Sequence, residues 1–222
     1  GLCFYHYIRN MSDRRNFLKK LAIVGGTMGL SPFAINRMIG AEEVKFNTKH
    51  YKDYTSENGM ATMISTWNHG MQANSAGFKA LKAGGNAMDM IEAAAKLVEE
   101  DAEGLSVGIG GLPDREGIVT LDACCMDHTG RAGSVAAMQD IMYPLSVARK
   151  VMEETPHVML VGEGAKMFAL ESGFKSTNLL TEKARQAWLR WMEKYEYKPV
   201  INIENHDTIG ILALDKEGRL SG

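Results

Sequence analysis

The sequence has few cysteines and almost no net charge, and each shortage excludes a class of protein. Its 222 residues include three cysteines, two of which, Cys124 and Cys125, are adjacent, so no disulfide framework can form. The 25 basic and 27 acidic side chains give a net charge of −2, which provides no cationic surface, and we expect no nucleic-acid partner. With 45% hydrophobic and 23% charged residues, the composition is that of an ordinary globular protein.

The sequence also lacks a long hydrophobic run near its N-terminus. Residues 21–35 are apolar but are interrupted by three glycines and a proline, whereas a membrane helix needs about 20 apolar residues. We therefore expect no stable membrane insertion. The stretch follows two adjacent arginines, Arg14 and Arg15, and this order resembles a twin-arginine export signal, which is an address and not an anchor. A basic amphipathic helix of the folded domain is the alternative.

We expect residues 1–41 to be an upstream extension and a signal peptide of an exported, periplasmic protein. Met11 is the expected natural start, and Ile39-Gly40-Ala41 fits a small-residue cleavage site. Residues 1–41 hold six of the 25 basic side chains and one of the 27 acidic ones, so the rest of the chain carries a net charge of −7. The small overall charge is thus an average over a basic leader and an acidic domain.

The rest of the chain alternates apolar β-branched runs with amphipathic stretches, which indicates a mixed α/β fold. Two turn signals, 127–130 and 215–218, each predict a β-hairpin. The acids Glu99, Glu100 and Asp101 are expected to be solvated, because a helix C-terminus disfavours negative charge. Strands are expected at 60–66, 117–126, 132–138, 157–161 and 209–214. Of these, 60–66 and 157–161 are expected to be buried. Helices are expected at 76–83, 87–100, 164–172, 182–195 and between Pro144 and Thr155.

The sequence offers no motif for a cofactor or a metal ion. Gly108–Gly111 is rich in glycine but does not have the GxGxxG spacing, so we interpret it as a structural turn and expect no dinucleotide. The six histidines never fall four residues apart on one helix, and no second cysteine pair accompanies Cys124 and Cys125. A zinc site therefore has no ligand set. We expect a protein without cofactor or metal.

One polar run, Asn205–Gly210, leads into the last expected strand and contains candidate chemistry. A threonine hydroxyl is a weak nucleophile. If the bond before Thr208 is cut, however, the new α-amine, with an ordinary pKa of about 8, can accept the hydroxyl proton. Asp207, on the other side of that bond, offers a carboxylate that can assist attack of the hydroxyl on the preceding carbonyl. On its own, the run also fits a plain loop that enters a strand.

Five separated motifs, taken together and in order, resemble the glycosylasparaginases, which are N-terminal-nucleophile hydrolases. The resemblance extends over 59–222 and implies an α/β (α+β) fold, namely a four-layer αββα sandwich whose C-terminal part is missing here. It also implies a precursor that cuts itself into an α-subunit, 42–207, and a β-subunit of which 208–222 is the truncated start. The motifs are Ser65–Asn68, Ser106–Asp114, Val119–Ala123, Thr155–Gly162 and Asn202–Gly210.

The same resemblance implies roles for individual residues. Thr208 is the nucleophile and its freed amine is the base, while Asp207 takes part in the self-cleavage. Ser106 hydrogen-bonds the amine, and Trp67 lines the substrate pocket. The implied substrate is a small glycosylated asparagine, N-acetylglucosaminyl-asparagine, whose amide bond is hydrolysed in glycoprotein degradation, and the implied assembly is a dimer of αβ units. His69 stands where we would expect an aromatic such as Phe.

Two alternatives stay open. The chain could come from an isoaspartyl peptidase or L-asparaginase of the same superfamily, against which Trp67 and the run His206-Asp207-Thr208 argue. It could instead be a truncated, non-catalytic remnant that pairs with another chain. The substrate anchors that the resemblance implies lie beyond Gly222. Because oxyanion donors contribute about 10² to 10³ in rate each, we expect the 222-residue chain by itself to be inactive.

Overall fold

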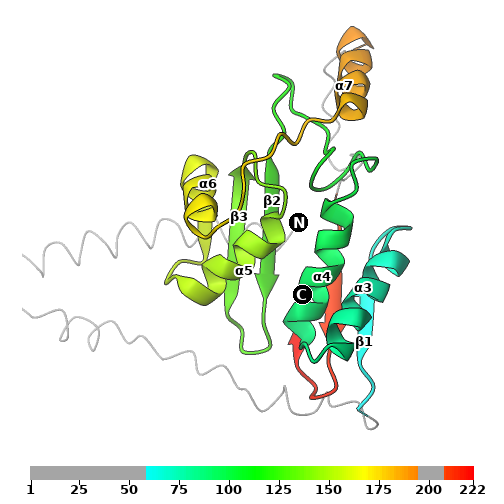
Figure 1. Ribbon diagram of the computed structural model, residues 1–222, viewed down its shortest axis with the longest axis vertical. Coiled ribbons are helices and arrows are strands. Elements are labelled where there is room, and N and C mark those ends of the chain that lie inside the picture. The colour runs from blue at the N-terminus through cyan, green and yellow to red at the C-terminus, as the bar shows by residue number, and fades with distance from the viewer. Residues whose placement is uncertain (1–58, 195–207) are drawn as a thin grey trace, which may run out of the picture. The chain divides into compact units, whose positions relative to one another are not determined.

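The computed structural model describes residues 59–194 and 208–222, all of which belong to one unit that spans 52–222 (Figure 1). The leader expected at 1–41 and Asp207 lie outside the described residues. The mixture of helices and strands confirms the α/β class. The elements are, in chain order, β1 (Thr62–Ser65), α3 (Gly70–Lys82), α4 (Ala87–Glu99), β2 (Leu121–Met126), β3 (Ala132–Met138), α5 (Pro144–Glu154), β4 (Met159–Val161), α6 (Gly162–Glu171), α7 (Glu182–Lys194), β5 (Ile211–Leu214) and β6 (Leu220–Ser221).

Two three-stranded sheets, with strand orders β1-β5-β6 and β2-β3-β4, form the frame of this unit. Neighbouring strands are antiparallel except β3 and β4, which are parallel. Met126, at the end of β2, and Gly222, just after β6, exchange two backbone hydrogen bonds with N···O distances of 2.8 and 3.1 Å. This exchange is typical of antiparallel neighbours, so the edges of the two sheets meet at β6 and β2.

Helices cover one face of each sheet, and the two sheets share one core. α3 packs on α4 and β1, α4 packs on β5, and α5 packs on β2 and β3 (Figure 1). Side chains alternate along a strand, so Met63 of β1, Cys125 of β2 and Ala213 of β5 all point to the helices and are buried. They form a single apolar cluster with Ile91 of α4 and Val147 of α5. Within the described residues, no helix is long and apolar enough to cross a membrane.

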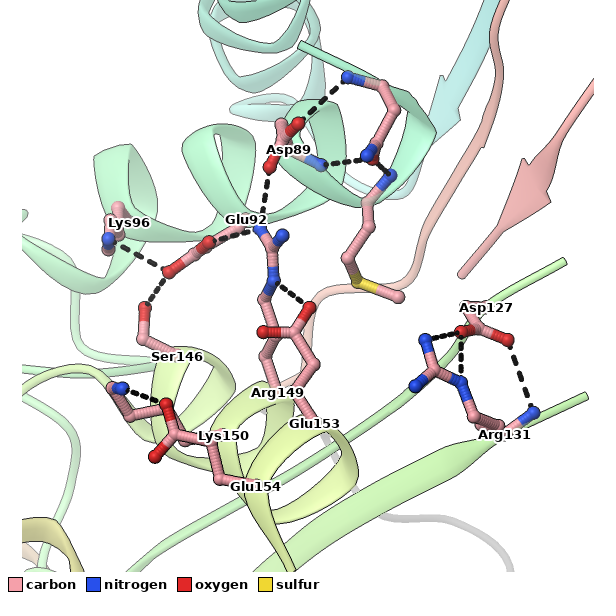
Figure 2. A network of polar contacts seen from close by, with 12 residues as sticks. Asp89, Glu92, Lys96, Asp127, Arg131, Ser146, Arg149, Lys150, Glu153 and Glu154 are labelled. Carbon is pink, nitrogen blue, oxygen red and sulfur yellow. Dashed lines mark hydrogen bonds and ion pairs between the residues drawn. The ribbon is translucent and has the colours of Figure 1, made fainter. Parts of the chain in front are cut away.

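A charged cluster fixes α4 against α5. Arg149 of α5 donates hydrogen bonds to Asp89 and Glu92 of α4 over 2.8 and 2.6 Å, and to Glu153 of its own helix over 2.8 Å (Figure 2). Ser146 donates a further hydrogen bond to Glu92 over 2.6 Å. Burial disfavours the positive charge, but the three carboxylates outweigh it and raise the pKa of Arg149 above its ordinary value. The cluster therefore holds α4 in a fixed position next to α5.

α3 begins at Gly70, earlier than the sequence predicts, because the strand before it turns directly into the helix. The polar residues ahead of Ser75 are typical of a loop, and this made 76 the expected start. Gly70, however, packs tightly on Ser65, where a Cβ at position 70 would lie 2.9 Å from the Ser65 carbonyl oxygen. Only glycine fits at this junction, and its N–H donates to the carbonyl of Trp67 over 3.1 Å.

β2 begins at Leu121, later than the expected 117. Asp114 accepts the backbone N–H groups of Glu116 and Ile118 over 2.8 and 2.9 Å and holds this segment in a turn. An aspartate that bonds the backbone two residues later favours a turn over a strand. The apolar pattern at 117–120 was therefore overridden by local hydrogen bonding.

The sheet face opposite the helices is apolar and exposed. The expectation that 60–66 and 157–161 form buried strands is wrong, because Ile64 is 64% exposed and Val161 is 55% exposed. In both strands, only the residue that points to the helices packs into the core. We call the opposite surface the open face. It carries the exposed side chains of Ile64, Met126, Met159, Val161, Leu212 and Leu220.

Candidate functional site

A cavity of about 630 Å³ lies between β2 and the segment that leads into β5. Thr208 and Ser106, two of the predicted site residues, both line it, although they are far apart in the sequence. The fold therefore brings together the candidate nucleophile and the serine predicted to support it. Other residues of the wall include Ile91, Ala95 and Glu99 of α4, Asp122 and Cys124 of β2, and Leu145 of α5.

Thr208 is exposed, two residues ahead of the chain that pairs with β1. Gly210, two residues later, accepts the backbone N–H of Thr66 over 3.0 Å and donates its own N–H to the Thr66 hydroxyl over 2.9 Å. These bonds extend the β1–β5 ladder beyond the pair of Ser65 and Ile211. The chain just after Thr208 is thus fixed against the end of β1 and is not a loose loop.

Trp67 lies at this same end of β1, in a strained backbone conformation. Its φ of 65° is in the left-handed region, which costs a non-glycine residue about 1–3 kcal/mol. The strain is held by the pairing of Thr66 with Gly210 and by the hydrogen bond from Gly70 to the Trp67 carbonyl. The side chain is 61% exposed. Trp67 is not one of the described residues that line the cavity. It lies next to the chain that carries Thr208, because Thr66 pairs with Gly210.

Ser106 belongs to a glycine loop, residues 104–111, that folds over the end of α4. Ile109 donates its N–H to the Glu99 carbonyl over 2.9 Å, and Gly110 donates to the Leu179 carbonyl over 2.9 Å. Gly108 has a φ of 67°, and a Cβ there would lie 2.1 Å from the Glu99 carbonyl oxygen, so no other residue fits. The predicted structural turn is confirmed, and it holds Ser106 at the cavity.

The glycine loop also contains the spacing Gly104-x-Ser106-x-Gly108. In a nucleophile elbow, this spacing joins a strand to a helix and exposes a reactive serine. Here it follows α4 and leads into turns and irregular chain ahead of β2. The local geometry is therefore not that of an elbow, and Thr208 remains the candidate nucleophile.

Glu99 is a site residue that the sequence analysis missed, and the expectation that it is solvated is wrong. Only 4% of its surface is exposed, whereas the adjacent Glu100 is exposed as expected. Oε1 of Glu99 accepts the backbone N–H of Leu145 over 3.2 Å, and among the described residues no donor reaches Oε2. A signal was present, because Ile91, Ala95 and Glu99 follow one another at intervals of four residues and share one helix face.

Burial raises the pKa of Glu99 to about 8. The Leu145 N–H and the charge of Lys96 act in the opposite direction, while the negative charges of Glu92 and Glu100 raise the pKa further. The carboxyl therefore keeps its proton in most molecules at neutral pH. Since Oε1 accepts a hydrogen bond, the proton belongs on Oε2.

Two other reactive side chains line the cavity. Asp122 accepts the backbone N–H of Ala137 over 2.6 Å, across the irregularity that shifts the β2–β3 register. Cys124 is an exposed free thiol, whereas Cys125 points into the core, where burial raises the pKa of its thiol to about 11. In the described part of the chain, no group of three His, Cys, Asp or Glu side chains is arranged to hold a metal ion.

Known proteins share this sequence at a level that shows common descent. A sequence model described as asparaginase matches residues 52–222. An N(4)-(β-N-acetylglucosaminyl)-L-asparaginase from Elizabethkingia miricola is 48% identical over 211 residues, which are 95% of this chain and 59% of the relative. The protein of that name from Rattus norvegicus is 33% identical over 192 residues, 72% of this chain and 55% of the relative.

An isoaspartyl peptidase/L-asparaginase from Rattus norvegicus is 35% identical over 154 residues, which are 68% of this chain and 46% of the relative. The chain thus spans 59% of the bacterial relative and about half of the two rat relatives. The resemblance to glycosylasparaginases is confirmed by the two relatives of that name. Because the family match includes every residue that the structure describes, this chain belongs to the asparaginase family.

Proposed function

We propose that this chain carries the self-cleavage site and part of the catalytic cavity of an N(4)-(β-N-acetylglucosaminyl)-L-asparaginase. Such an enzyme hydrolyses the amide bond between N-acetylglucosamine and asparagine in glycoprotein degradation. The main support is that Thr208, at the entry to a strand, and Ser106, on a rigid glycine loop, line the same cavity. The name of the 48% identical bacterial relative agrees with this activity.

In the proposed precursor, the Thr208 hydroxyl attacks the carbonyl carbon of Asp207. The C–N bond between the two residues breaks as the new C–O bond forms, and the hydroxyl proton passes to the nitrogen. Water then hydrolyses the ester, which leaves a carboxylate on residue 207 and frees both the hydroxyl and the amine of Thr208. An α-amine with an ordinary pKa of about 8 is partly neutral at pH 7 and can serve as the base for the adjacent hydroxyl.

In the proposed mature enzyme, the Thr208 hydroxyl attacks the side-chain amide of the glycosylated asparagine. The amine of Thr208 takes the hydroxyl proton and transfers it to the leaving aminosugar, and an aspartyl ester forms on Thr208. Water hydrolyses this ester and releases aspartate. In this scheme Ser106 hydrogen-bonds the amine, and Trp67, which is exposed next to the chain that carries Thr208, lines the substrate pocket.

We also propose that the whole protein is a four-layer αββα sandwich. The open face presents large apolar side chains such as Ile64 and Leu212, which gain stability only when another layer covers them. A second sheet packs on such a face at a spacing of about 10 Å. This chain would supply one layer of helices and one sheet, and the rest of the whole protein would supply the other two layers.

The proposed organisation of the chain follows from the sequence. Residues 1–41 would be the export leader to the periplasm, 42–207 the α-subunit, and 208–222 the start of the β-subunit. The adjacent arginines at 14 and 15 support the leader, and the position of Thr208 at a strand entry supports the boundary. A dimer of αβ units is the proposed assembly.

An isoaspartyl peptidase or L-asparaginase is the second candidate, since one such relative is 35% identical to this chain. The two activities share the attack on a β-aspartyl amide and differ in the leaving group. A protein that contains this sequence should therefore be assayed on N-acetylglucosaminyl-asparagine and on a β-aspartyl dipeptide. Faster hydrolysis of the dipeptide would favour the second candidate.

The self-cleavage is tested by intact mass spectrometry on a protein that contains this sequence. We expect the wild type to split between Asp207 and Thr208 and to yield a product that begins at Thr208. Thr208→Ser keeps a hydroxyl and should still be cut, whereas Thr208→Val keeps the shape, lacks the nucleophile and should stay intact. Thr177→Val is the matched control outside the cavity. An uncut wild type, or equal cleavage of Thr208→Val, contradicts the proposal.

A further inference from the structure

Glu99 differs from the other buried acids of the described chain because no cation pairs with it. The carboxyls of Asp127 and Asp215 each accept several backbone N–H groups and pair with an arginine. Glu99 has one hydrogen bond, from the Leu145 N–H, and within the described residues its Oε2 has no partner. A buried, unpaired carboxyl is costly to ionise, so the folded protein favours the protonated form of Glu99.

Glu99 also joins three segments of the cavity wall. It is the last residue of α4, and its carbonyl accepts the N–H of Ile109 from the glycine loop that carries Ser106. Its carboxyl accepts the N–H of Leu145 in the first turn of α5. In the described chain, the residue before that helix, Tyr143, gives no side-chain cap, so Glu99 supplies the acceptor that the first turn lacks.

The charges around Glu99 set how it responds to pH. On α4, Lys96 favours ionisation, while Glu92 and Glu100 oppose it. From α5, the Leu145 N–H favours the ionised form, and Tyr143 donates its hydroxyl to Glu100 over 2.5 Å. Burial outweighs these contributions and raises the pKa of Glu99 to about 8, which lies inside the range in which a hydrolase can be assayed.

We propose that Glu99 is a positioning residue for the Thr208 cavity: while its carboxyl carries a proton, it stays buried at the junction of the end of α4, the Ser106 loop and the start of α5, and keeps these three segments together. Loss of the proton places an unpaired charge in the wall. The wall then opens to admit water, and the glycine loop loses its hydrogen bond from the Ile109 N–H to the end of α4. The effect on self-cleavage rests on the proposed function, because it acts on Thr208 through the cavity wall, but the effect on the wall does not.

The test is made on a protein that contains this sequence and compares the wild type with Glu99→Gln, which keeps the acceptor for Leu145, replaces the Oε2 hydroxyl by an amide N–H and cannot ionise. Wild-type self-cleavage should fall about tenfold between pH 7 and 9, since about a tenth of the carboxyl is protonated one unit above its pKa. Glu99→Gln should equal the wild type within about twofold at pH 7 and keep its rate at pH 9. Glu171→Gln, at an exposed position of α6 outside the cavity, is the control and should follow the wild type.

Hydrogen exchange gives a readout that does not require self-cleavage. The backbone amide of Ile109 should lose protection above pH 8 in the wild type, after correction for the intrinsic pH dependence of exchange, and keep it in Glu99→Gln. Parallel pH profiles for the two proteins in both measurements overturn the inference. If no variant is cleaved but the exchange profiles diverge, the proposed self-cleavage fails and the positioning of the wall by Glu99 stands.

Discussion

The turn that joins β2 to β3 and the turn that joins β5 to β6 share one five-residue pattern, Asp-x-x-Gly-Arg, at 127–131 and 215–219. In both, the glycine N–H donates to the aspartate carbonyl, over 3.0 and 3.1 Å, and the arginine Nε donates to the aspartate carboxylate, over 2.9 and 2.7 Å. Both glycines have positive φ, 83° and 77°, as this type of hairpin requires. A short local pattern is thus sufficient to specify the turn.

The two aspartates differ in what they reach beyond the turn. Asp215 also accepts the N–H of Ala87, the first residue of α4, over 3.1 Å, and its side chain is fully buried. Asp127 is 7% exposed by side chain, and among the described residues its hydrogen bonds come from its own turn (Figure 2). The same motif is therefore a local turn in one place and, in the other, an anchor for the helix that carries Glu99.

The largest effect predicted from this comparison is the loss of stability in Asp215→Ala. The variant should cost about 2–4 kcal/mol, because the Ala87 N–H and the N–H groups of the turn lose their acceptor, at about 1–3 kcal/mol for each buried group, whereas Arg219 is 36% exposed and keeps Glu217. Asp127→Ala should cost only about 1–2 kcal/mol, since Arg131 is 59% exposed and water replaces the carboxylate. Urea unfolding of the full chain measures both values, and equal losses would mean that the contact with α4 adds nothing.

The hairpins could be predicted from the sequence because their chemistry is local, and the same holds for α4 and α5, which the sequence places within a residue or two. The contact between Asp215 and Ala87 could not be predicted, since the two residues are 128 positions apart. The left-handed conformation of Trp67 also depends on distant partners, among them Gly210. The chemistry of its polar run made Thr208 a candidate, and the family resemblance added its role and Ser106, but only the fold reveals that the two residues line one cavity.

The next effect in size concerns acid stability. Burial would raise the pKa of both aspartates, but their hydrogen bonds and arginine partners more than offset it, so both pKa values lie below the ordinary value. A carboxyl with a lowered folded-state pKa stabilises the protein above its unfolded-state pKa of about 3.9, and this stabilisation is lost as the pH falls through the folded-state pKa. Replacing either aspartate by asparagine should therefore reduce the loss of unfolding free energy that occurs as the pH falls.

The measurement is the shift of the urea midpoint between pH 6 and pH 3 in the wild type, Asp215→Asn and Asp127→Asn. The shift should be smaller in both variants than in the wild type, and smallest in Asp215→Asn, whose carboxyl has the additional Ala87 N–H in the folded state. If Asp127→Asn reduced the midpoint shift more than Asp215→Asn, the pairing with arginine, and not the contact with α4, would determine how much each aspartate contributes to the pH dependence.

The smallest expected effect comes from exchanging the two variable residues of the turn, so that His-Thr replaces Lys216-Glu217. The exchange removes the contact of Glu217 with Arg219, whose side chains are 64% and 36% exposed, and such a pair is worth about 0–1 kcal/mol. It introduces a threonine hydroxyl, which in the other turn donates to the aspartate over 2.6 Å. Because the loss and the gain are similar, stability should change by less than about 0.5 kcal/mol. A loss above about 2 kcal/mol would show that the surrounding sheet, and not the shared Asp-x-x-Gly-Arg pattern, determines the turn.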